Sequence, residues 1–503
     1  MLKIKKMKNV NLNFLAILIG LFAFGITSCK KDDPIVIPDA PVLTAPNSIT
    51  LVEEGFTTGI TFNVSIPGGY ASAAVKALNG SAAISTAPSV GSTSGTIEVT
   101  FTAANTSGAG SVTLTVTDKN QKTDEETALL TIEKESLIIP VNANITSNTT
   151  WVTGKTYILN TRVFVTKGVT LTIEPGVIVK GSAGSDVNAT ALIIAQGAKI
   201  NAEGTASQPI IFTSVADKIE PGQIASPNLI PTLNGLWGGL IILGKAHISY
   251  QDDQGNDSQT ASIEGIPPDD ANGIYGGTDD ADNSGILKYV SIRHGGTSIG
   301  EGNEINGLTL GGVGSSTIIE NIEIIANQDD GIEWFGGTVN VKNVVVWNTG
   351  DDAIDTDQAW SGTVDNMVII NPGDECFELD GPEGSYLNGA HTIKNATVSV
   401  GNASGLIDFD NNTNVAMMNI LFRNLTLKTQ DIEGYGGYLS VGAFSSSAFE
   451  VILPNGFTVP EIFKEGSDAI TTQVTSETKT VGADLTKFAT WSWAAIAGQL
   501  TGL

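Results

Sequence analysis

Acidic residues recur at a regular interval in the C-terminal half of the sequence. They stand in three related stretches, QDDGIEWFGG (328–337), GDDAIDTDQAW (350–360) and GDECFELDG (373–381), and a weaker fourth copy, GLIDFDN, covers 405–411. Asp329, Asp351 and Asp374 follow one another at intervals of 22 and 23 residues. Units of strand and turn that repeat at this interval, without a helix between them, are typical of a β-solenoid. Equivalent positions of the copies should therefore lie in adjacent coils.

Strand alternation assigns a direction to each of these side chains. Successive residues of a strand point to opposite faces, so Ile332 and Trp334 are predicted to point inward while Glu333 points outward. The same rule gives two outward columns, one of Glu333, Asp355, Glu378 and Asp408, and one of Asp357, Asp380 and Asp410. Coils stack about 4.8 Å apart, where carboxylates repel unless protons or a hard cation lie between them. We therefore predict that these seven residues bind calcium, which accepts flexible carboxylate clusters.

Other side chains near the repeats could contact or transform a ligand. Trp347 and Trp360 adjoin the acidic stretches, and we predict that they stack on sugar rings. Catalysis would need an acid or a base, and the candidates for it are Arg293, His294, Asp351, Asp352 and Lys394. None of these candidates stands in a complete catalytic motif, so the catalytic residues stay open.

The elements that would position these residues are almost all strands. Between 38 and 135, short segments such as SVTLTV (111–116) alternate apolar and polar residues between turns, which predicts an Ig-like β-sandwich. After Ile138, units such as VTLTIEPG (169–176) recur at intervals of roughly twenty residues. We predict an all-β chain in which a right-handed parallel β-helix follows the sandwich and covers 138–503. It would contain an acidic insertion at 251–284 and a C-terminal cap at 485–503.

Several stretches of this region match a known group of proteins. They include LTIEPGVIVKG, LIIAQGAKINAEGT, LWGGLIILGKA, DDGIEWFGGTVN and the closing WSWAAIAGQL. From about residue 140 to the end, the chain resembles surface lipoproteins of the Bacteroidota type that carry a pectate-lyase-like right-handed parallel β-helix. The resemblance implies the fold and brings no settled activity.

Three functions are open for the acidic face. The working hypothesis is that it binds calcium and an extracellular polysaccharide or surface partner without catalysis. The first alternative is a calcium-dependent polysaccharide lyase or glycoside hydrolase. GDDAID is similar to the GDD element of polygalacturonases, but their accompanying histidine and Arg-x-Lys elements are missing. The second alternative is a structural or adhesive surface protein, in which the acidic turns only close the corners of the coils.

The composition excludes several other functions. The chain has 53 Asp and Glu against 26 Lys and Arg, a net charge of −27, and no basic patch, so we expect no nucleic-acid partner. Two cysteines and three widely separated histidines among 503 residues exclude a disulfide framework and a Cys/His zinc site.

The first residues have the three parts of an export signal. Four lysines precede an apolar stretch from Phe14 to Ile26, and small residues then lead to Cys29. We predict a signal peptide at 1–28, lipidation of Cys29 at a sequence that resembles a lipobox, and a lipidated tether at 29–37. The lipid would attach the protein to a membrane. The run KKDD (30–33) resembles the export tag of surface lipoproteins, which favours the outer membrane and the cell surface, where an outer-membrane protein is a further possible partner.

Overall fold

The computed structural model describes residues 36–47, 50–134, 136–252, 254–267, 270–299, 304–438 and 449–503. The predicted signal peptide, Cys29 and most of the tether lie outside these residues. Contacts divide the chain into two compact units, residues 1–135 and 136–503. Within the described ranges, no helix is both long and apolar enough to cross a membrane.

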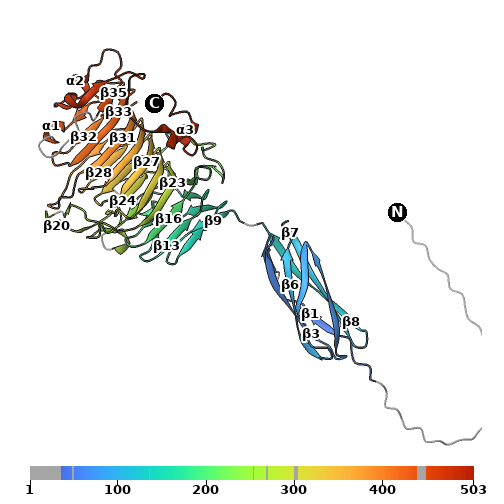
Figure 1. The fold of residues 1–503 in the computed structure, drawn as a ribbon. Coiled ribbons are helices and arrows are strands. Elements are labelled where there is room, and N and C mark those ends of the chain that lie inside the picture. The colour runs from blue at the N-terminus through green and yellow to red at the C-terminus, as the bar shows by residue number, and fades with distance from the viewer. Residues whose placement is uncertain are drawn as a thin grey trace, which may run out of the picture. The chain divides into compact units, whose positions relative to one another are not determined.

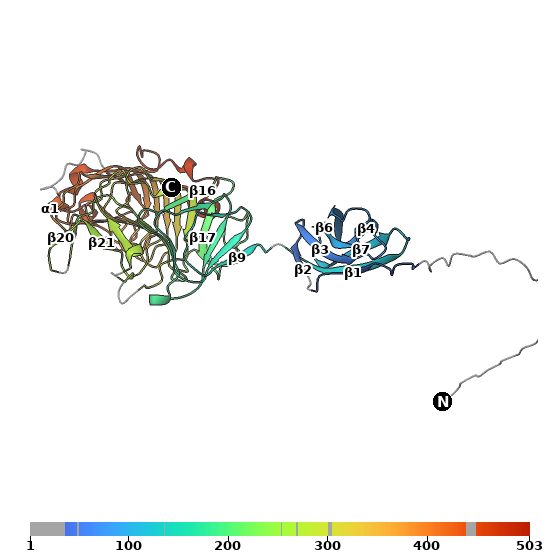
Figure 2. The same cartoon turned by 90° about the horizontal axis from the view of Figure 1, so that it is seen from below.

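The N-terminal unit contains two four-stranded sheets (Figures 1 and 2). The first has the order β1 (Val42–Thr44), β3 (Thr57–Ser65), β6 (Ser94–Ala103), β5 (Gly80–Thr86), and the second has the order β2 (Thr50–Glu53), β8 (Thr123–Glu133), β7 (Gly108–Asp118), β4 (Tyr70–Leu78). Alternate residues such as Phe62, Phe101 and Leu114 point between the sheets and are fully buried. This packing of two apolar faces is the predicted Ig-like sandwich.

The second unit is a right-handed parallel β-helix, as predicted. One wall, here the acidic wall, is a nine-stranded parallel sheet. Its strands in order are β12 (Val163–Val165), β15 (Leu192–Ile194), β18 (Leu240–Leu243), β24 (Leu308–Gly311), β26 (Ile332–Phe335), β28 (Ile354–Asp357), β30 (Glu378–Leu379), β32 (Ile407–Phe409) and β34 (Ile432–Glu433). Apolar residues of these strands alternate into a continuous core shared with the other wall.

The remaining strands form a fifteen-stranded sheet. They are β9 (Ile138–Val141), β10 (Thr149–Trp151), β11 (Thr156–Leu159), β13 (Thr170–Ile173), β14 (Ile178–Gly181), β16 (Lys199–Glu203), β17 (Ile210–Ser214), β23 (Gly285–Arg293), β25 (Ile318–Ile325), β27 (Asn340–Trp347), β29 (Thr363–Ile370), β31 (His391–Ser399), β33 (Val415–Arg423), β35 (Phe449–Val451) and β36 (Thr471–Gln473). Because β23 pairs with both β16 and β17, two sides of a coil join there into one strand that bends in the middle.

Asparagines occupy this bend in the later coils. Asn321, Asn343 and Asn366 have positive φ angles of 60°, 57° and 68°, which asparagine tolerates better than most residues. Their amides hydrogen-bond to one another, with Asn343 Nδ2 donating to Asn321 Oδ1 at 3.0 Å and Asn366 Nδ2 to Asn343 Oδ1 at 2.8 Å. The side-chain amides therefore bond from coil to coil and form a ladder.

The insertion between β18 and β23 contains short antiparallel strands. They are β19 (Tyr250–Gln251) with β20 (Asp257–Ser258), and β21 (Thr260–Ser262) with β22 (Ile274–Gly276). Ile248, Ile263 and Tyr275 pack on the outside of the acidic wall against Ile241 and Phe335. The insertion therefore covers the part of this wall that contains β18 and β26.

The C-terminal segment does not cap the end of the β-helix, and this prediction is wrong. Along the chain, α1 (Tyr435–Tyr438), α2 (Val459–Ile462) and η3 (Ser467–Ile470) precede β36. This strand is the last one of the fifteen-stranded sheet. The segment with η4 (Leu485–Lys487) and α3 (Trp493–Ile496) instead packs on the side of the fifteen-stranded sheet (Figure 1). Trp491 and Trp493 cover an outward stripe of apolar residues that includes Ile325 and Val345. Burial of that stripe explains the location.

Candidate functional site

Carboxylates form a column along the outer face of the acidic wall. In the strand register, Glu333 lies beside Asp355, Asp355 beside Glu378, and Glu378 beside Asp408. This is the arrangement that alternation predicts. The column extends one coil further at each end, to Thr309 and to Glu433. The intervening residues, such as Ile332, Trp334 and Leu379, are fully buried in the core.

The second predicted column lies at the ends of the same strands. The backbone N–H of Asp380 donates to Thr356 O at 2.8 Å, and that of Asp410 donates to Leu379 O at 3.2 Å, so Asp357, Asp380 and Asp410 follow one another from coil to coil. Glu383 lies close to this column. Burial is the first cause that raises the pKa of Asp357, and the negative charge of Glu383 is the second. Two parallel lines of acids therefore cross the wall.

A third line of acids lies at the turn before each strand. The Oδ1 atom of Asp330 accepts the backbone N–H of Asp352 at 3.0 Å, and the Oδ1 atom of Asp352 accepts that of Glu375 at 2.6 Å. Each carboxylate thus holds the turn of the next coil. The paired acids of the sequence repeats have different roles, because Asp352 is buried in this chain of bonds and Asp351 is turned toward Asp329.

Two groups of these acids have the spacing of a cation site. Carboxylate oxygens of Asp329, Asp330 and Asp351 lie within 4.8 Å of one another, and so do those of Asp330, Glu333 and Asp355. Asp330 belongs to both groups. The Oδ1 atom of Asp355 is buried and has no hydrogen-bond partner among the described residues. A cation between the coils would satisfy this oxygen and neutralise its neighbours.

The electrostatics of the acids agree with this geometry. Burial, followed by the charges of neighbouring carboxylates, raises the pKa of Asp330, Glu333 and Asp355 well above the usual range. The same two causes raise the pKa of Asp329 to about 7, and burial with a hydrogen bond to Glu378 raises that of Asp352 to about 12. The charges that perturb these five groups all belong to other carboxylates. Protons or cations must therefore compensate the negative charge of the acidic wall at neutral pH.

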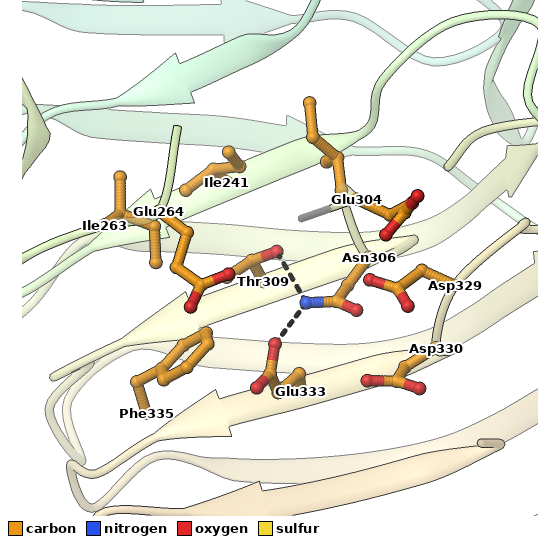
Figure 3. A pocket seen from close by; sticks show the side chains of 11 residues that line it. Ile241, Ile263, Glu264, Glu304, Asn306, Thr309, Asp329, Asp330, Glu333 and Phe335 are labelled. Atoms are coloured by element: carbon orange, nitrogen blue, oxygen red, sulfur yellow. Dashed lines mark hydrogen bonds between the residues drawn. The ribbon is translucent and has the colours of Figure 1, made fainter. Parts of the chain in front are cut away.

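A pocket of about 280 Å³ opens beside the first of the two groups (Figure 3). Its lining is Ile241, Ile263, Glu264, Glu304, Ile305, Asn306, Thr309, Asp329, Asp330, Glu333 and Phe335. The Nδ2 atom of Asn306 donates to the Glu333 carboxylate and, at 3.5 Å, to Thr309 Oγ1. Figure 3 shows the carboxylates of Glu264, Glu304 and Asp329 around the same opening. The pocket thus offers many oxygen ligands and no cationic side chain.

Three of the predicted catalytic candidates lie on the other sheet or directly after one of its strands. Arg293, at the end of β23, is fully buried, and its Nη2 and Nη1 atoms donate to Glu323 at 3.4 Å and to Ile224 O at 2.5 Å. His294 is also buried, with Nδ1 2.5 Å from Leu233 O, and burial lowers its pKa. Lys394 of β31 pairs with Asp365 at 3.6 Å. Chain segments distant in sequence cover Arg293 and His294, so they cannot serve the acidic wall.

The prediction that Trp347 and Trp360 stack on a ligand is also wrong. Trp360 is 1% exposed in the core, where its ring lies 4.6 Å from that of Trp334. Trp347 is 4% exposed, because Trp493 of the C-terminal segment covers it at 6.0 Å between ring centroids. Neither indole ring is accessible to a sugar.

Several residues of the acidic column and of the pocket were missed from the sequence. Thr309 and Glu433 could have been found by continuing the alternation by one coil in each direction. Glu264 and Glu304 come from loops outside the repeat, and no periodic signal marks them. Asn306 occupies the position of Asp330 one coil earlier, where the acidic repeat has not yet begun.

The comparison with known families agrees with the fold. A family profile described as "Pectate-lyase like beta helix domain" matches residues 143–496. The chain belongs to this family.

Solved structures show more distant similarity to this pectate-lyase-like chain. A family 28 exopolygalacturonase from Yersinia enterocolitica is 12% identical, with 86% of this chain and 90% of that chain covered and a TM-score of 0.24. A chimeric titin Z1Z2 is 23% identical, with 20% of this chain and 100% of that chain covered and a TM-score of 0.15. A search of curated proteins gave no match.

Proposed function

We propose that the acidic wall binds calcium and, through it, an extracellular polysaccharide that the protein does not cleave. The observation that carries this proposal is the pair of carboxylate groups that share Asp330, where three oxygens of each group lie within 4.8 Å. Calcium takes six to eight oxygen ligands in flexible geometry, so water and ligand oxygens would complete its coordination. A cation held in this way leaves positions free for a sugar.

The length of the acidic column suits an extended chain molecule. From Glu333 to Glu433 it crosses five coils, which corresponds to about 19 Å at a coil spacing of about 4.8 Å. Acidic polysaccharides could bind only through cations, because carboxylates would otherwise meet carboxylates. Hydroxyl groups of neutral sugars could also complete the coordination of a bound ion.

The proposed location follows from the N-terminal sequence. Lipid on Cys29 would attach the protein to the outer membrane, and the sandwich would act as a spacer between the anchor and the β-helix. A surface location would give the acidic wall access to environmental calcium and to polysaccharide. Globomycin treatment of expressing cells should leave an unprocessed precursor, and unchanged processing would contradict lipidation.

Calcium titration of the purified, chelator-treated protein tests the central part of the proposal. We expect isothermal titration calorimetry to detect binding to the wild type and a loss of at least about tenfold in affinity for Asp355→Asn/Glu378→Gln. Glu98→Gln/Glu126→Gln is the matched control, because it also removes two negative charges, both exposed on the sandwich. Equal calcium affinity for all three proteins would contradict the proposed site.

Glycoside hydrolysis is the second candidate, and Asp329 favours it. Its pKa of about 7 would let it give a proton to a leaving oxygen at neutral pH, and Asp351 lies beside it. Oxygens within 4.8 Å are closer than the roughly 6.5–9.5 Å between the carboxyls of inverting enzymes, so hydrolysis would retain the anomeric configuration. Lyase chemistry is less favoured, because Arg293 and Lys394 lie on the other sheet.

Product analysis separates binding from turnover. We expect no reducing ends and no unsaturated products from a panel of neutral and acidic polysaccharides incubated with the calcium-loaded protein. Reducing ends that appear with the wild type and disappear with Asp329→Asn would contradict the non-catalytic proposal and support hydrolysis.

A further inference from the structure

A second cavity, of about 500 Å³, lies outside the acidic pocket and shares no lining residue with it. Three segments that are distant in sequence line it: residues 247–250, residues 257–259 and residues 384–386. The middle segment belongs to the insertion hairpin of β19 and β20, and β20 is labelled at the edge of the β-helix in Figure 2. Its volume is within the range of about 300–1,000 Å³ that is usual for small-molecule sites.

An oriented histidine forms one side of this cavity. His247 Nδ1 lies 2.8 Å from Asp280 Oδ1, and the backbone N–H of His247 donates to the same oxygen at 3.0 Å. Because a carboxylate only accepts, Nδ1 carries a proton, so Nε2 is the acceptor in a neutral ring. Nε2 has no hydrogen-bond partner among the residues that the structure describes. It can therefore accept a hydroxyl group of a ligand.

An aromatic ring stacks on this histidine. The ring centroids of His247 and Tyr386 are 4.7 Å apart and their planes differ by 13°. The loop that carries Tyr386 is fixed from two sides: Ser385 donates through its N–H at 3.1 Å and through its hydroxyl to Asp257, and Gly384 N–H donates to Ser249 Oγ at 3.2 Å. The aromatic wall is thus formed before a ligand arrives, which lowers the entropic cost of binding.

The chemistry of the cavity fits a neutral sugar. Partly exposed tyrosine rings can cover the C–H faces of a pyranose, while serine hydroxyls, the Gln259 amide and His247 Nε2 can bond its hydroxyls. His247 is the only basic residue in the lining, and Asp257 and Asp280 hold negative charge at its border. A uronate or a phosphate would therefore be repelled.

The cavity is joined to the end of the acidic columns. The backbone N–H of Ser249 donates to the carbonyl oxygen of Gln358 at 3.0 Å, and Gln358 directly follows Asp357. The Nε2 atom of Gln358 in turn donates to Glu383 at 3.1 Å. One polysaccharide could contact the acidic wall and this cavity together.

We infer that the cavity lined by His247 and Tyr386 is a calcium-independent subsite for a neutral sugar unit, an inference that rests on the proposed function of polysaccharide binding. The subsite would select the sugar, while the acidic wall would hold the chain through cations. Two binding sites of this kind on one rigid body would increase overall affinity without any new contact.

The test is calorimetry with neutral hexasaccharides of β-1,4-linked glucose, xylose, mannose and galactose, in EGTA. We expect at least one of them to bind the wild type, and Tyr386→Ala to weaken this binding about tenfold or more. Tyr386→Phe keeps the ring and should stay within a few fold of the wild type. Phe56→Ala is the control, because it removes an exposed aromatic ring from the sandwich.

The outcomes separate this inference from the proposed function. No binding of any neutral hexasaccharide in EGTA, or equal binding by Tyr386→Ala and the wild type, would overturn the subsite even where calcium still binds the acidic wall. Neutral-sugar binding that depends on Tyr386 in a protein with no calcium affinity would support the subsite and refute the calcium proposal. Thermal melting of Tyr386→Ala should match the wild type, since the ring is on a surface loop.

Discussion

Replacement of Asp329 by asparagine measures the electrostatic strain of the acidic wall. Burial and nearby carboxylates, of which Asp351 is the first, raise the pKa of Asp329 from 3.8 to about 7. At about 1.4 kcal/mol for each pH unit, this difference from the unfolded chain corresponds to about 4 kcal/mol. Asp329 borders an open pocket, where solvent screening should reduce the effect, and we expect roughly half of it, about 2 kcal/mol.

The sign follows from the direction of the pKa change. A carboxyl whose pKa is raised by folding contributes stability that is fully present below about pH 4 and is lost as the pH rises to about 7. Asp329→Asn should therefore leave the free energy of unfolding unchanged at pH 4. At pH 8 in EDTA, where the wild-type carboxylate is ionised, the variant should be more stable by about 2 kcal/mol.

Urea denaturation followed by tryptophan fluorescence at the two pH values is a suitable assay. Glu98→Gln, an exposed change on β6, is the control and should alter the free energy of unfolding little at either pH. Calcium at pH 8 should reverse the order, because an ion at 100 times its dissociation constant adds about 2.7 kcal/mol to a protein that binds it. Equal or lower stability of Asp329→Asn at pH 8 in EDTA would refute this reasoning.

Three further substitutions test the packing around the site. Trp360→Ala should lower the free energy of unfolding by about 3–5 kcal/mol, because the indole is buried, and the folded variant should bind glycan as the wild type does. Loss of glycan binding at unchanged stability would contradict the place of Trp360 in the core. Glu323→Gln should lower the free energy of unfolding by about 3–5 kcal/mol, because it removes the carboxylate that pairs with the buried Arg293. Limited proteolysis should then release the C-terminal segment, whose Ala494 N–H bonds to Glu323. An unchanged melting temperature would contradict the ion pair's contribution to stability. Asn343→Ala should cost about 1–3 kcal/mol through lost ladder bonds and a strained positive φ, and an unchanged free energy of unfolding would contradict the ladder. Asn343→Gly should cost less, because glycine adopts the positive φ without strain, and the reverse order would contradict that strain.

Local periodicity was enough to predict the β-helix and the direction of its acids. The sequence contains both the alternation within each strand and the length of each coil. Counting residues therefore gives the strand register of the column, which consists of Glu333, Asp355, Glu378 and Asp408. The left-handed bends could be anticipated at Asn343 because few other residues adopt that conformation without strain.

Contacts between distant segments could not be predicted in this way. Trp347 points outward, as alternation requires, but Trp493 covers it from 146 residues away, and nothing near either residue specifies the contact. The burial of Arg293 depends in the same way on Ile224, Glu323 and the C-terminal segment. Residues on an outer face are exposed only where no other part of the chain covers them, which periodicity does not report.

The most direct test of the calcium site is a crystal structure of the protein grown with calcium, with anomalous data collected at a long wavelength. The account predicts an anomalous peak between the carboxylates of Asp330, Glu333 and Asp355 or of Asp329, Asp330 and Asp351, at about 2.3–2.6 Å from their oxygens. Ordered carboxylates with no anomalous peak at either group, at a calcium concentration that saturates binding in solution, would contradict it.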